Sequence, residues 1–178
     1  HDICDLIGVE RPHPPMVDDD KNGYILQKSV PVYLDGRISH RRIDMYKRGC
    51  FIWETKQYVS AEQFTREGKR PYHAVSESFS WNKYMLAARD QAEAYARSLP
   101  THEGKVPFLL VADAGYCIYV YADFQGSGIY RPFPNARENR ILFDDLIDNA
   151  DAQTLLRTIW TNPLSLDPTI HTERVTHQ

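Results

Sequence analysis

Apolar and polar positions along the chain first predict strands and then a long helix. Residues 58–80 are polar, contain several helix breakers, and predict a mobile loop. In chain order, the pattern predicts a strand over 24–33, a β-hairpin of 42–46 and 50–57, a helix over 81–99, a hairpin of 108–112 and 116–121, and short helices over 141–147 and 152–160. This order indicates an α/β fold in which helices pack on a mixed central sheet.

Composition narrows the class of protein. The chain has 178 residues, of which 42% are hydrophobic and 25% charged, so it has the size and balance of one globular domain with a real core. No apolar run approaches the roughly 20 residues that cross a bilayer, so no membrane contact is expected. The cysteines Cys4, Cys50 and Cys117 lie far apart without a C-x-x-C pair. This pattern indicates a reducing compartment, and the predicted location is the cytoplasm.

The net charge of −3 is not typical of a nucleic-acid-binding protein, but the charge is uneven. Basic residues gather over 37–48, where Asp44 is the main acid, and acids gather over 18–20 and 144–151. Most such clusters are solvated faces. A basic cluster matters here only if it flanks a candidate active site.

The predicted hairpin carries two acids and a lysine. Strand alternation places Glu54 and Lys56 on one face together with Ile52. If the turn centres on Arg48, Asp44 lies opposite Ile52 and diagonal to Glu54, with backbones roughly 7–8 Å apart. Carboxylates at that separation suit Mg²⁺, and a lysine beside them suits hydrolysis of a phosphodiester. The pattern alone is weak, and the alternative is a solvated Glu54–Lys56 pair on an exposed hairpin.

The long helix contributes a second feature. Gln91 and Tyr95 are one helical turn apart, so they share a face and could bond a phosphate or a catalytic water through amide and hydroxyl groups. Tyr95 also belongs to the apolar stripe of the helix, so the alternative is an ordinary core tyrosine.

These motifs resemble a known family. The D…E-x-K core followed by Q-x-x-x-Y is similar to the RecB-type branch of PD-(D/E)xK nucleases. The longer phrases over 42–57, 88–100, 107–113 and 156–168 resemble the N-terminal region of large bacterial MmeI-like DNA methyltransferases. Those are restriction-modification or phage-defence enzymes, including methylases of BREX- and DISARM-type systems. The resemblance implies a restriction-endonuclease-like fold over 1–162, with 163–178 starting a linker.

The resemblance also implies a Mg²⁺-dependent DNA endonuclease module, with Mn²⁺ as a substitute. In this interpretation Asp44 and Glu54 bind the metal and Lys56 is the catalytic lysine. Supporting groups around the phosphate would be Gln57, Gln91 and Tyr95, and contacts to the DNA backbone would come from Arg41, Arg42, Lys47 and Arg48.

The implied partners are double-stranded DNA, other domains or subunits of the parent defence enzyme, and a second copy of the chain for cleavage of both strands. S-adenosylmethionine would serve only a methyltransferase region, whose motifs this chain lacks. Where relatives tend to place a glutamate in the first strand, this chain has Gln27, which would weaken metal binding. The alternatives are therefore an inactive nuclease-fold module that binds DNA or partner subunits, and a scaffold for the methyltransferase.

Overall fold

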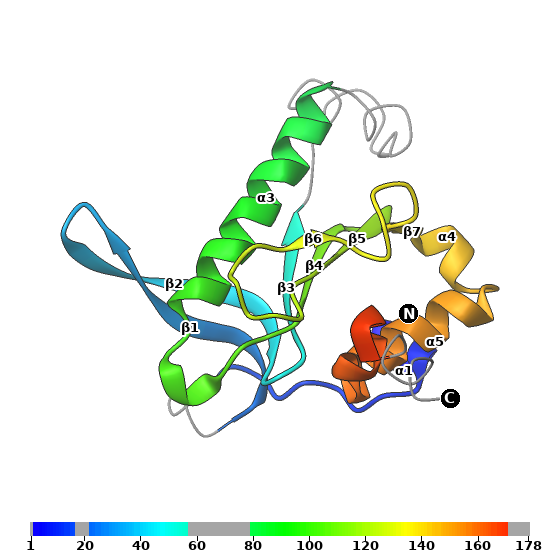
Figure 1. Cartoon of the computed structure of the whole chain (residues 1–178), viewed down its shortest axis with the longest axis horizontal. Helices are drawn as coiled ribbons and strands as arrows, with labels where there is room; N and C mark the ends of the chain where they lie inside the picture. The colour runs from blue at the N-terminus through cyan, green and yellow to red at the C-terminus, as the bar shows by residue number, and fades with distance from the viewer. Residues whose placement is uncertain (1, 17–21, 57–78, 171–178) are drawn as a thin grey trace.

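A computed structural model describes residues 2–16, 22–56 and 79–170 of the chain, and it shows a central sheet with helices on both sides (Figure 1). The elements in chain order are α1 (Ile3–Ile7), β1 (Tyr24–Leu34), β2 (Arg37–Lys47), β3 (Phe51–Lys56), α3 (Phe79–Ser98), η2 (Thr101–Glu103), β4 (Phe108–Asp113), β5 (Cys117–Ala122), β6 (Arg131–Pro132), β7 (Arg140–Leu142), α4 (Phe143–Leu146), α5 (Ala150–Thr161) and η3 (Pro163–Leu166). The predicted α/β fold with a mixed sheet and flanking helices is confirmed. None of these helices is long and apolar enough to cross a membrane.

The strands are hydrogen-bonded in the order β1-β2-β3-β4-β5-β6, and β7 also pairs with β5. Strands β3 and β4 are parallel, with Lys56 beside Asp113 at their carboxyl ends, whereas the other pairs among the described strands are antiparallel. A parallel pair needs a crossover connection, and α3 lies between these two strands in the chain. Helix α3 is therefore the crossover, and it packs on one face of β3 and β4.

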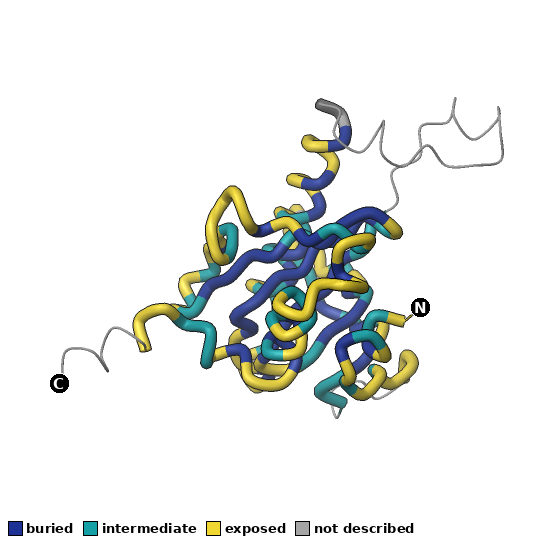
Figure 2. The backbone as a smooth tube through the Cα atoms, turned by 90° about the vertical axis from the view of Figure 1, so that its right-hand side faces the viewer, coloured by how far each residue is buried: buried dark blue, intermediate teal, exposed yellow. Residues whose placement is uncertain are grey.

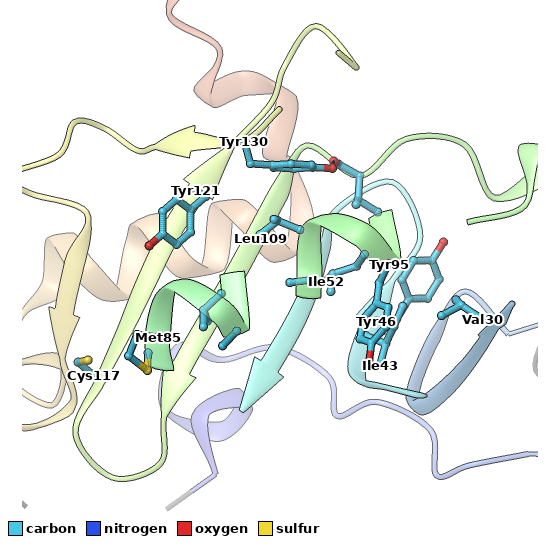
Figure 3. Packing of buried hydrophobic residues seen from close by; sticks show 14 of the residues in the cluster. Val30, Ile43, Tyr46, Ile52, Met85, Tyr95, Leu109, Cys117, Tyr121 and Tyr130 are labelled. Atoms are coloured by element: carbon cyan, nitrogen blue, oxygen red, sulfur yellow. Dashed lines mark hydrogen bonds between the residues drawn. The ribbon is translucent and has the colours of Figure 1, made fainter. Parts of the chain in front are cut away.

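Two hydrophobic cores lie on opposite faces of the sheet. The first lies under α3, whose buried residues Trp81, Ala88, Ala92 and Tyr95 recur at the predicted helical spacing; Figure 3 shows part of this cluster. The second lies under α1 and α5 and includes Trp160. In Figure 2 the buried strands run between more exposed outer segments. A sheet covered on both faces explains why β4 is buried at every position.

The structure differs from the sequence prediction at the first hairpin. Strand β2 begins at Arg37 instead of residue 42, and it pairs with β1 along almost its whole length. The connecting turn is Asp35–Gly36, where both residues have positive φ, of 48° and 73°. An Asp-Gly pair with this geometry is a favoured two-residue hairpin turn, so the sequence did carry the signal.

Smaller differences occur at the predicted helix over 141–147 and at the predicted loop over 58–80. The helix predicted over 141–147 starts as strand β7 and becomes helical at Phe143. Pro163 is buried and Leu166 packs on the second core, while the division of the chain after residue 162 stays a prediction. Of the predicted mobile loop, 58–78 lie outside the described residues, and 79–80 form the first residues of α3.

Candidate active site

Strand β3 presents its two charged residues on the α3 side of the sheet. Ile52 belongs to the first core, whereas Phe51 and Trp53 belong to the second, so the predicted alternation is confirmed. Glu54 is 2% exposed, and its Oε2 lies 3.8 Å from Lys56 Nζ. The pair is thus not an exposed hairpin face, because the carboxylate is buried in the sheet.

Asp44 reaches this pair from β2 in a different register from the predicted one. Tyr46, not Asp44, lies opposite Ile52, so the predicted register was wrong by two residues. The reason is the turn, which centres on Gly49 with its φ of 71° and is closed by Cys50 N–H donating to the Lys47 carbonyl. Continuing the observed register places Asp44 across from Glu54 instead of diagonal to it. The two acids are still brought together.

The Asp44 carboxylate takes the place of a backbone acceptor in the pairing of β2 with β3. Regular pairing of β2 with β3 stops at Met45–Trp53, and Asp44 Oδ2 then accepts a hydrogen bond from Thr55 N at 2.7 Å. Its other oxygen, Oδ1, accepts from Gln27 Nε2 at 3.3 Å. Because both oxygens are bonded to neighbouring strands, the carboxylate is held in one orientation.

Gln27 has an unusual backbone, with a φ of 55° inside strand β1. A left-handed non-glycine residue costs about 1 kcal/mol and is tolerated where the surroundings enforce it. Ile25 and Lys28 both face the α3 side although they are three residues apart, so the side-chain alternation of β1 changes phase at Gln27. The distortion occurs beside Asp44, where it turns the Gln27 amide toward the acid.

Helix α3 holds the lysine. Gln91 Oε1 accepts a hydrogen bond from Lys56 Nζ at 3.0 Å, and Gln91 Nε2 donates to the Tyr95 hydroxyl. Tyr95 is also a buried core residue beside Tyr46 and Ile43 (Figure 3). Tyr95 is therefore both a core residue, through its ring, and a hydrogen-bonding partner of Gln91, through its hydroxyl. The roles proposed for these residues in chemistry stay predictions.

Electrostatics single out Glu54. Burial, and then the nearby charge of Asp44, raise its pKa to about 7, against the opposing effects of Lys56 and a backbone hydrogen bond from Asp44. Its Oε1 is buried and accepts no hydrogen bond from the described residues. The pKa of Tyr95 is raised mainly by burial and lowered by the bond from Gln91 and the charge of Arg41. Arg41 therefore acts electrostatically on the same centre.

The chemistry of these residues fits a hard divalent cation. Across residues 2–16, 22–56 and 79–170, no group of three or more His, Cys, Asp and Glu side chains converges as a metal site. Mg²⁺, however, usually takes one or two carboxylates together with water and phosphate oxygens. Asp44 and Glu54 are such a pair, and the unsatisfied Glu54 oxygen is a buried acceptor for which a cation would compensate.

The four cations predicted to contact DNA do not form one surface. Arg41 and Arg42 are exposed neighbours on opposite faces of β2. Lys47 Nζ donates to the Trp160 carbonyl at 2.7 Å, and Arg48 Nε donates to Glu103 at 2.8 Å. Arg41 shares its face of β2 with Ile43 of the first core, whereas Arg42 Nη1 donates to the Gln27 carbonyl at 3.4 Å. DNA contact by all four stays a prediction. Gln57 lies outside the described residues.

Comparison with protein families identifies the chain. The family model described as MmeI, N-terminal domain, matches residues 1–178. The chain belongs to the MmeI N-terminal domain family. Membership points to a region of a restriction-modification enzyme. Comparison with curated proteins gave no match, and comparison with solved structures gave none.

This MmeI N-terminal domain also contains a buried ion cluster that sequence reasoning missed. Lys28 Nζ, 1% exposed, lies 2.9 Å from Glu103 Oε1, while Arg48 Nε and the Tyr46 hydroxyl donate to Glu103 Oε2 at 2.8 and 2.6 Å. Burial alone would raise the pKa of Glu103, but the bonds from Arg48, Tyr46 and Lys28 outweigh it and lower the pKa to about 2. Through this cluster, η2 is bonded to strands β1 and β2.

Proposed function

We propose that this centre belongs to a Mg²⁺-dependent DNA endonuclease module with a restriction-endonuclease-like fold. The observation that carries the proposal is the buried Glu54 carboxylate, which has an unsatisfied oxygen beside a second, rigidly oriented acid, Asp44. A buried acid with an unsatisfied oxygen beside a second acid is costly unless a cation joins them. Family membership supports DNA as the substrate and the parent restriction-modification enzyme as the context.

Each residue then has a defined task. Asp44 and Glu54 hold Mg²⁺, or Mn²⁺ in its place, which when bound polarises the phosphate and favours ionisation of a water. The Lys56 amine orients the attacking water and offsets charge on the phosphate. Gln91, supported by Tyr95, holds that amine in place. The water oxygen forms a bond to phosphorus and gives up a proton to solvent, the phosphorus bond to one sugar oxygen breaks, and that oxygen takes up a proton from solvent.

The wider partners follow from the same proposal. Double-stranded DNA is the substrate, and the module acts with other domains or subunits of the parent enzyme. Cleavage of both strands would need two centres, which a homodimer would supply. S-adenosylmethionine belongs to the methyltransferase region of such enzymes and has no assigned residues in this chain.

Replacing Lys56 with alanine tests the activity directly. We expect the variant to nick supercoiled plasmid at least about 100-fold more slowly in Mg²⁺ or Mn²⁺, because it loses a group that stabilises the transition state. Lys105→Ala, an exposed lysine near the opposite ends of the parallel strands, is the control and should cut like the wild type. Equal nicking by Lys56→Ala and the wild type would contradict the proposal.

A second candidate function is DNA or partner binding without cleavage. The specific observation that favours it is Gln27, whose amide donates to Asp44 at the position where the family resemblance implies an acid. Such a module would have little need for a cation.

Metal affinity separates the two candidates. By titration calorimetry we expect Asp44→Asn, which has the same shape without the charge, to bind Mn²⁺ at least tenfold more weakly than the wild type. Asp35→Asn in the hairpin turn, where asparagine suits the positive φ, is the control and should bind like the wild type. Equal Mn²⁺ binding by the Asp44→Asn variant and the wild type would favour the module that does not cut.

A further inference from the structure

The hairpin of β1 and β2 extends beyond the rest of the sheet. Strand β3 pairs with β2 only from Met45 to Lys47, whereas β1 and β2 continue to pair from Lys28–Ile43 out to Leu34–Arg37. Residues 28–43, here called the β1–β2 arm, are therefore a two-stranded ribbon. Figure 1 shows it reaching away from the body, past α3.

One face of the arm looks toward the candidate active site. Val30 belongs to the first core and Val32 packs against it, so this face is anchored at its base. Arg41 lies opposite Val30, and directly opposed residues share a face of an antiparallel pair. Arg37, four residues before Arg41 in β2, lies on the same face, farther out. The charge of Arg41 also lowers the pKa of Tyr95, so it acts on a residue of the candidate active site.

The other face of the arm carries exposed apolar side chains. Tyr33 and Ile38 are cross-strand partners with 73% and 59% of their surface exposed. Next along the same face, Pro31 lies opposite His40, and Arg42 follows at the base. An aromatic and a branched aliphatic side chain paired on a projecting ribbon do not serve the domain's own core.

Charge and shape together indicate the partner. The arm has three exposed arginines, Arg37, Arg41 and Arg42, against one exposed acid, Asp35, in a chain whose net charge is −3. A concentrated positive charge on an otherwise acidic chain suits a polyanion. The major groove of B-DNA, about 12 Å wide, admits a two-stranded ribbon, and apolar side chains contact thymine methyl groups there.

We propose that the β1–β2 arm binds duplex DNA by entering the major groove. In that position Tyr33 and Ile38 face the bases, with Arg42 on the same face of the ribbon. The long side chains of Arg37 and Arg41 leave the other face and contact phosphates at the border of the groove. Because that face looks toward Asp44 and Glu54, the strand that carries these phosphates is the one brought to the candidate active site. This inference rests on the proposed function in taking DNA as the substrate, and it adds the element that holds the duplex.

Binding without cleavage tests the arm by itself. The affinity of the chain for a short labelled duplex is measured by fluorescence anisotropy in EDTA across a series of salt concentrations. We expect Arg37→Ser/Arg41→Ser to bind at least tenfold more weakly. The slope of log K against log salt should also fall by about 2, at roughly 0.9 for each lost phosphate contact. The control Arg131→Ser/Arg137→Ser removes the same charge from exposed positions elsewhere and should change affinity less than twofold.

A second variant tests entry into the groove. Tyr33→Ser/Ile38→Ser should weaken binding about tenfold without changing the salt slope, because it removes apolar contacts and no charge. Methyl green, a major-groove ligand, should compete with the protein, whereas the minor-groove ligand netropsin should not. Circular dichroism checks that each variant is folded.

The outcomes separate this inference from the proposed nuclease. The proposal that the arm binds DNA would be overturned if the wild type did not bind duplex. It would also be overturned if the arm variant and the control variant lost the same affinity. Unchanged binding by Tyr33→Ser/Ile38→Ser would overturn entry into the groove. Because binding is measured in EDTA and does not depend on cleavage, a wild-type protein that binds through the arm but never cuts would count against the nuclease alone.

Discussion

Replacing Glu54 with glutamine is expected to abolish metal-dependent cleavage and at the same time to stabilise the metal-free protein at pH 8. Cleavage should fall roughly 100-fold or more, because the amide cannot offer a second charged ligand to the cation. Stability should rise because the carboxylate is buried with an unsatisfied oxygen, which the neutral amide tolerates better.

The pH dependence of stability follows from the raised pKa of Glu54. The ordinary value is 4.5 and the folded value is about 7, so between these values the folded state holds a proton that the unfolded state has lost. The free energy of unfolding therefore falls as pH rises from 4.5 to 7 and loses nothing further above 7. This difference in pKa corresponds to a loss of about 3 kcal/mol in the free energy of unfolding.

Urea denaturation in EDTA at pH 5 and pH 8 measures this contribution. The wild type should be less stable at pH 8 than at pH 5, and Glu54→Gln should lack most of that decrease. Adding Mn²⁺ at pH 8 should stabilise the wild type and leave the variant unchanged, because a ligand stabilises only the state that binds it. Parallel pH profiles for both proteins would contradict the burial of an ionisable Glu54 at this site.

Replacing Glu103 with alanine is expected to destabilise the fold by about 3–5 kcal/mol, the usual effect of breaking a buried ion pair from one side. Lys28, which is almost fully buried, would be left without its carboxylate, and Tyr46 would lose its acceptor. Arg48 is partly exposed and can regain water, so Lys28 accounts for most of the loss.

Urea denaturation at pH 7 measures the effect, with the exposed Glu10→Ala as a control that should change stability by less than about 0.5 kcal/mol. The double variant Lys28→Met/Glu103→Leu should be more stable than Glu103→Ala, because it removes both buried charges. Since the pKa of Glu103 is lowered to about 2, its ionised form stabilises the fold above pH 4.5. That contribution is lost as pH falls from 4.5 to 2. A Glu103→Ala variant as stable as the control would contradict the cluster.

The sequence predicted the parts of the site that depend on short-range periodicity. Glu54 and Lys56 share a face because strand side chains alternate, and Gln91 and Tyr95 share one because a helix turns in 3.6 residues. The register that joins Asp44 to them was predicted wrongly, since Arg48 and Gly49 are equally plausible turn centres until the positive φ of Gly49 is known.

Other features had no local signal. Lys28, Tyr46 and Glu103 are far apart in the chain, and strand pairing together with the position of η2 brings them into contact. Gln27 was recognised only as a departure from relatives. Its bond to Asp44 depends on a left-handed backbone that no pattern of apolar and polar residues predicts for a glutamine.

The phase change at Gln27 determines where this chain can vary in length. Residues inserted at the exposed Asp35–Gly36 tip would lengthen the loop and leave the pairing below it intact. Inserting one residue after Gln27 would instead turn the following part of β1 over. Lys28 would then face away from Glu103, and Val30 would leave the core. Insertions are therefore expected at the tip of the hairpin and not beside Asp44.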